Sequence, residues 1–71
     1  MNFVIVILDY CNKEVRVYHF NNRNKPKDPE KWIQEHDKKW KDSQCYYMCG
    51  DTINIRYMDN STGECVVEEL I

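Results

Sequence analysis

Residues Phe3–Leu8 form an unbroken run of apolar side chains, and this run most constrains how the chain can fold. The run is far shorter than the roughly 20 residues that a helix needs to cross a bilayer. Its Val and Ile side chains favour a strand, because branching at Cβ restricts their rotamers in a helix. Alternate residues of a strand point to opposite faces, so both faces of this strand are apolar. We therefore predict an interior strand with cover on both sides.

The flanks of this run do not resemble a secretory signal. Such a signal has a basic segment before its apolar run and small residues after it. Here Met1 and Asn2 precede the run, and Asp9, Tyr10 and Cys11 follow it. We expect a cytoplasmic protein with no membrane partner.

The chain has 71 residues, of which 42% are hydrophobic and 13% aromatic. This composition supports one small hydrophobic core and predicts a single domain over residues 1–71. A core of this size gives modest stability, which self-association would increase. The net charge of −2 creates no overall attraction to nucleic acid or membrane, although residues 21–42 are basic and residues 43–71 are acidic.

Residues 14–20 alternate in polarity and predict a second strand. Val15 and Val17 share one face of it with His19, and Arg16 shares the other with Tyr18 and Phe20. Residues 11–13 supply a turn, so the first two strands form an antiparallel hairpin with the second strand toward the edge of the sheet.

Asp28-Pro29-Glu30 predicts the start of a helix, because Asp caps free amides, Pro fits the first turn and Glu complements the helix dipole. We expect the helix to run from about Pro29 to Lys41. Its apolar stripe would contain Pro29, Trp32, Ile33, His36 and Trp40. His36 packed between the two tryptophans is the favoured interpretation, and a catalytic base beside a cysteine is the alternative.

The C-terminal third predicts further strands. Residues 45–49 and 52–58 read as one strand with a bend or bulge at Gly50, and residues 65–70 as the last strand. Asp59–Gly63 is a turn in which Gly63 takes a left-handed conformation. Glu64, Glu68 and Glu69 make the last strand a charged edge.

The element order β-β-α-β-β predicts an α+β fold. We expect one four-stranded antiparallel sheet in the spatial order 2-1-3-4, with the helix packed on one face. The helix then leaves one face of the first strand open, either Val4, Val6 and Leu8 or Phe3, Ile5 and Ile7.

Several short motifs carry a resemblance to a known group. These are Leu8-Asp9-Tyr10, Glu14-Val15, Tyr18, and Ser43–Met48 followed by Asp51 and Ile53. The chain resembles small uncharacterised proteins encoded by gut anaerobic bacteria and their mobile elements, which share the strand ending in Asp-Tyr and the later Cys-aromatic-aromatic-Met. It departs from them in its basic middle segment. The resemblance implies a bacterial cytoplasmic setting and no catalytic residues.

The four cysteines are expected to be free thiols, since cytosolic proteins stay reduced. A cross-strand disulfide from Cys45 or Cys49 to Cys65 is the alternative. Zinc is disfavoured because Cys45 and Cys49 would lie about 13 Å apart along a strand. We expect no metal and no cofactor. A thiol-dependent enzyme is the third and weakest functional hypothesis.

Lysines near the expected helix suggest an anion-binding patch, and a nucleic-acid-binding accessory protein is therefore the second hypothesis. A solvated helix face explains the same residues, because acidic side chains are interleaved with them. The patch would consist of Lys31, Lys38, Lys39 and Lys41.

The five tyrosines are too many for so small a core, so some should lie on the open sheet face. Aromatic residues, Met and Arg are enriched at the centres of protein interfaces. The leading hypothesis is therefore a non-enzymatic protein-interaction module that uses its open sheet face or an edge strand, with an unknown protein or a second copy as partner. The candidate interface residues are Tyr10, Tyr18, Tyr46, Tyr47, Met48, Arg56 and Tyr57.

Overall fold

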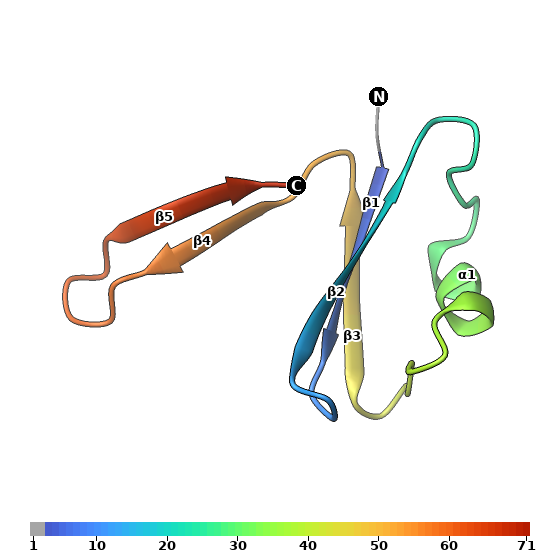
Figure 1. Ribbon diagram of the computed structural model, residues 1–71, viewed down its shortest axis with the longest axis horizontal. Helices are drawn as coiled ribbons and strands as arrows, with labels where there is room; N and C mark the ends of the chain where they lie inside the picture. The colour runs from blue at the N-terminus through green and yellow to red at the C-terminus, as the bar shows by residue number, and fades with distance from the viewer. Residues whose placement is uncertain (1–2) are drawn as a thin grey trace.

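The computed structural model describes residues 3–71, which form five strands and one helix (Figure 1). The elements in chain order are β1 (Phe3–Asp9), β2 (Glu14–Phe20), α1 (Pro29–His36), β3 (Cys45–Gly50), β4 (Asn54–Met58) and β5 (Cys65–Leu70). They make two antiparallel sheets, one of three strands in the order β2-β1-β3 and one formed by β4 and β5. We call the β4–β5 hairpin the arm, because it projects from the three-stranded sheet on the side opposite α1.

The prediction of one four-stranded sheet in the order 2-1-3-4 is wrong. The pairing of β1 with β3 ends at Val4 and Gly50, and the chain then leaves the plane of the sheet instead of bulging and continuing. Ile53 turns back onto the sheet, where it is 9% exposed, and its backbone bonds to Ile71. Burial of Ile53 thus separates residues 54–70 into a sheet of their own.

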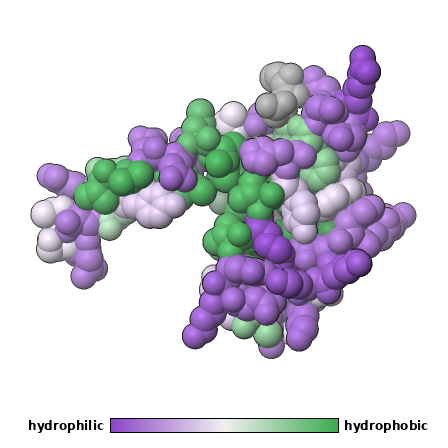
Figure 2. All heavy atoms as spheres, in the orientation of Figure 1, coloured by the Kyte–Doolittle hydropathy of each residue, from purple (hydrophilic) through white to green (hydrophobic). Residues whose placement is uncertain are grey.

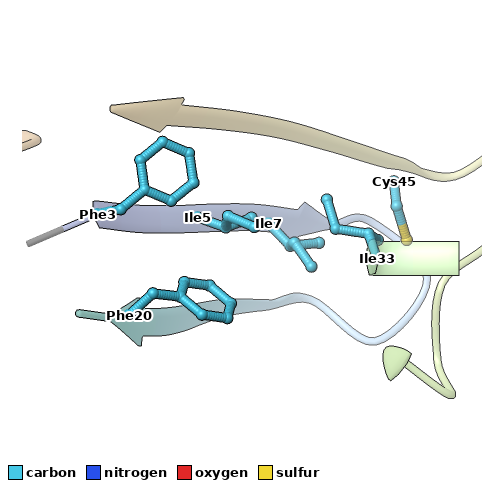
Figure 3. Close-up of a cluster of buried hydrophobic side chains, with 6 residues drawn as sticks. All are labelled: Phe3, Ile5, Ile7, Phe20, Ile33 and Cys45. Carbon is cyan, nitrogen blue, oxygen red and sulfur yellow. The ribbon is translucent and has the colours of Figure 1, made fainter. Parts of the chain in front are cut away.

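The central position predicted for the first strand is confirmed, since β1 lies between β2 and β3. Phe3, Ile5 and Ile7 point toward α1 and form the main core with residues from β2, α1 and the start of β3. Figure 3 shows this cluster, whose other members are Phe20, Ile33 and Cys45. Trp32 and Trp40 pack on its margin, so α1 and the segment after it cover one face of β1.

The opposite face of the three-stranded sheet, which we call the open face, is covered at one end only. Val4 and Val6 form a second small core with Ile53, against which Val17 and Ile71 pack. The Ile53 N–H donates to the Ile71 carbonyl at 2.6 Å and the Ile71 N–H donates to the Ile53 carbonyl at 2.8 Å, so this pair closes the base of the arm. Leu8, at the other end of β1, is 40% exposed.

The helix starts where the sequence predicts and ends earlier. Asp28 caps it by accepting a hydrogen bond from the Lys31 amide at 3.2 Å. It ends at His36 rather than near Lys41, because Asp37 takes an extended conformation and its carboxylate binds Arg16 of β2. Within residues 3–71, no helix has the length and apolar character needed to span a membrane.

The arm is a two-stranded ribbon with a well-defined tip. The Asp59 carboxylate accepts hydrogen bonds from Ser61 and from the Thr62 amide, and Gly63 takes the predicted left-handed conformation with φ of 74°. A register shift between Tyr57 and Met58 marks a bulge. Every residue of β5 is exposed, so the arm lacks a core and depends on its base for attachment.

Ile33 is the single buried residue of α1 and should anchor it. We expect Ile33→Ala to lower the free energy of unfolding by about 3 kcal/mol, because the substitution leaves a cavity in the main core. Urea denaturation followed by circular dichroism measures this change. Gln34→Ala, at an exposed position of the same helix, is the matched control and should change stability by less than about 0.5 kcal/mol. Equal effects of the two substitutions would show that α1 is not held by Ile33.

Candidate protein-interaction surface

The uncovered end of the open face carries a group of exposed apolar side chains, which we call the open-face patch. Its members lie on neighbouring strands, because Leu8 of β1 pairs with Val15 of β2 and with Tyr46 of β3. Met48 follows Tyr46 by two residues, so it lies on the same face. Their exposed fractions are 40% for Leu8, 56% for Val15, 63% for Tyr46 and 54% for Met48. Tyr10 extends the patch by packing edge to face on Tyr46, with ring centroids 5.7 Å apart.

A hollow of about 420 Å³ lies at the end of this patch, beside the β1–β2 turn. Leu8, Val15 and Tyr10 contribute its apolar walls, and Lys13 also lines it. The other lining residues are Asp9 and Glu14, whose carboxylates bind Arg16. The hollow is therefore suited to an apolar side chain of a partner.

The arm carries a second group of exposed apolar residues. Tyr57 and Val67 are paired across the two strands, so they share one face. The half-buried Ile55 lies on the same face, where it pairs with Glu69. This face continues from Ile53 and Ile71, which pack on Val4 and Val6. Figure 2 shows hydrophobic residues along the arm and at its junction with the rest of the molecule.

The seven candidate interface residues do not form one surface. Tyr10, Tyr46 and Met48 lie in the open-face patch. Tyr18 and Tyr47 lie on the face that α1 covers, because they pair with Ile5 and Ile7. Tyr18 is half-buried against Trp32, with ring centroids 5.0 Å apart, and burial raises its pKa above the ordinary value. Arg56 and Tyr57 lie on opposite faces of the arm, and Arg56 is 3.3 Å from Glu68.

The candidate basic patch is dispersed by the early end of the helix. Lys31 lies on α1, whereas Lys38, Lys39 and Lys41 follow it in non-helical segments. The Lys39 ammonium lies 3.3 Å from Glu14 of β2. These four lysines therefore do not share one helix face.

A cluster of charged side chains lies between the sheet and the segment after α1. The Arg16 guanidinium donates to Asp9 at 2.6 Å, to Glu14 at 2.7 Å and to Asp37 at 2.9 Å. The Asp9 and Asp37 side chains are almost fully buried. Arg16 thus ties together β1, β2 and the residue that ends the helix.

The hydrogen bonds of this cluster favour ionised carboxylates. Donation from Arg16, and then from the side chain and backbone of Asn12, holds the pKa of Asp9 far below its ordinary value. Donation from Arg16 and Lys39 lowers the pKa of Glu14. Because every carboxylate here binds the Arg16 guanidinium, we assign the cluster a structural role.

The cysteines are unpaired, and His36 contacts an aromatic ring. The four cysteines are free thiols, with Cys45 buried in the main core and Cys11, Cys49 and Cys65 exposed. Among residues 3–71 there is no group of three metal-binding side chains that could hold an ion. His36 stacks on Trp32 with ring centroids 4.6 Å apart and is exposed, whereas Trp40 packs on Tyr47 instead.

Comparison of the chain with protein-family models, with curated proteins and with solved structures found no match. The resemblance to small proteins of gut anaerobic bacteria therefore stays a prediction.

Part of this surface has no clear signal in the sequence. The sequence pattern assigns Val15 to a strand face without indicating its exposure, and it presents Val66, Val67 and Leu70 only as parts of a charged edge strand. All of them are exposed. The alternation of β2 is the one available signal, because it places Val15 and Val17 opposite the face that binds α1.

Removing the Arg16 guanidinium should leave the buried carboxylates of Asp9 and Asp37 without their main partner. We expect Arg16→Met to lower the free energy of unfolding by about 3 kcal/mol at neutral pH, the range found when one member of a buried ion pair is removed. Chemical denaturation measures the loss. Arg23→Met, in the exposed loop before α1, is the control and should change stability little. A tolerated Arg16→Met substitution would contradict the structural role of the cluster.

The lowered pKa of Asp9 predicts how stability varies with pH. Near pH 4 the unfolded chain binds a proton at Asp9, whereas the folded chain does not, so acid favours the unfolded state. Stability should therefore be constant above about pH 5 and fall as the pH drops through 4. Denaturation midpoints between pH 3 and pH 7 measure this slope. The slope should be smaller in Asn12→Ala, which removes a hydrogen bond to Asp9. A flat profile in the unsubstituted chain would contradict the assignment.

Proposed function

We propose that this protein is a protein-interaction module that binds an apolar surface of a protein partner through the open-face patch. The observation that supports this most directly is the placement of three exposed apolar side chains at paired positions of three strands, Leu8, Val15 and Tyr46, beside the hollow of about 420 Å³. Contiguous exposed apolar groups of this kind mark interaction sites in small proteins.

The composition of the patch agrees with that role. Tyr and Met are enriched at the centres of interfaces, and the patch contains two tyrosines and Met48. Charged residues adjoin the patch, because Lys13, Asp9 and Glu14 also line the hollow. The resemblance of the sequence motifs adds a bacterial setting to the proposal.

Photo-crosslinking tests the proposal even though the partner is unidentified. A chain that carries benzoylphenylalanine in place of Tyr46 should give a discrete protein adduct on irradiation in an extract of the cell that encodes it, with a second copy counted as a possible adduct. The same probe in place of Gln34, on the exposed side of α1, is the control and should give none. Val15→Lys should lower the adduct yield about tenfold, because it places a charge in the apolar contact. Identical adducts from positions 46 and 34, or no adduct from position 46, would refute the proposal.

A further inference from the structure

We propose that the partner of the open-face patch is a second copy of this chain, bound by reciprocal exchange of the arms. In this dimer the arm of each copy lies on the open-face patch of the other. This inference rests on the proposed function and names its partner. It is supported by the area of the arm, by the net charges of residues 54–71 and 1–53, and by the positions of the two surfaces in the fold.

The area of the arm requires two contacts rather than one. Its strands have five and six residues, so at 3.4 Å per residue the arm is about 20 Å long and two strands wide. Laying one face of such a ribbon on a partner buries on the order of 400 Å² per molecule. A stable interface buries about 800 Å² per partner. Two reciprocal contacts together bury about 800 Å² per partner, because each copy then contributes both its arm and its patch.

The net charges favour a dimer in which the arm of one copy contacts the sheet of the other over a dimer in which the two arms contact each other. Residues 54–71 carry Arg56 and four acidic side chains, a net charge of −3, whereas residues 1–53 carry nine basic and eight acidic side chains, a net charge of +1. Two arms in contact would bring like charges together, which is unfavourable at an interface. Placing the arm on the rest of a second chain joins net charges of opposite sign.

The positions of the arm and the patch allow both arm-to-patch contacts to form in one two-fold symmetric dimer. The arm joins the three-stranded sheet at the Val4 end of β1, on the open-face side, and the patch lies at the Leu8 end of the same face. A two-fold axis that inverts the strand direction places the Leu8 end of one sheet beside the arm junction of the other. Each arm then reaches the patch of the other copy, and the same contact occurs twice.

One face of the arm is suited to this contact. Near the tip of the arm, Tyr57 and Val67 lie on the face that continues from Ile53 and Ile71, and Glu69 lies on the same face nearer the base. Leu70 pairs with Asn54 on the other face. We place Tyr57 and Val67 against the patch of the second copy, where Leu8 and Val15 border the hollow.

Light scattering over concentrations from about 1 to about 200 µM tests the dimer. We expect a mass twice that of the chain at the upper end of this range. Val15→Lys in the patch and Val67→Lys in the arm should each raise the dimer dissociation constant at least tenfold. Leu70→Lys, an exposed position on the other face of the arm, is the matched control and should leave the constant unchanged. All three positions are exposed, and circular dichroism checks that each variant is folded.

Native cysteines report the arrangement within the dimer. Cys11 lies in the β1–β2 turn beside the patch, Cys65 starts β5 next to the tip of the arm, and both thiols are exposed. In a mixture of ¹⁴N- and ¹⁵N-labelled chains, a short bismaleimide should join Cys11 of one label to Cys65 of the other. Crosslinks from Cys65 to Cys65 alone would indicate an arm-to-arm dimer and overturn the inference.

The outcomes separate this inference from the proposed function. A chain that stays monomeric up to about 200 µM, or a dimer unaffected by both Val15→Lys and Val67→Lys, overturns the exchanged dimer. If the probe at position 46 then gives an adduct with a different protein, the interaction module stands and its partner is not a second copy. If that probe gives no adduct, both proposals fail.

Discussion

The central strand β1 has two apolar faces, and the rest of the structure depends on how each face is covered. One helix covers the side of Phe3, Ile5 and Ile7 with a complete core. The other side receives only Ile53 and Ile71, which cover Val4 and Val6. Residues 3–71 contain no second helix for that face, so the cover is partial. Because so little of the chain covers this face of β1, part of the face is left as the open-face patch, and the arm is attached to the rest of it.

The charged cluster around Arg16 decides the path of the chain between α1 and β3. By binding the carboxylate of Asp37, Arg16 ends the helix at His36 and fixes the turn that follows. Trp40 then lies outside the helix and packs on Tyr47 at the margin of the core. A helix continuing to Lys41 would instead carry Asp37 away from Arg16 and remove one of the three carboxylates that bind its guanidinium.

Local patterns allow the elements to be predicted, and contacts between distant residues explain the errors. The bounds of the second and last strands, the start of the helix and the turn at Gly63 follow from alternation, capping and backbone preference. The end of the helix depends on a bond between Arg16 and Asp37, and the separate arm depends on burial of Ile53 against Val4, neither of which has a local signal. For the same reason composition alone groups the tyrosines together, although pairing with Ile5 and Ile7 places Tyr18 and Tyr47 on the covered face.

The acidic strand β5 also affects solubility. The arm exposes strand edges, and such edges can pair with further chains in a series that does not close. Glu68 and Glu69 place one carboxylate on each face of the arm, so a stack of arms would align carboxylates along its length. Repulsion between these carboxylates opposes the growth of fibres and leaves association to the apolar pair Tyr57 and Val67. The C-terminal strand therefore limits assembly size, and neutralising its glutamates removes this protection against aggregation.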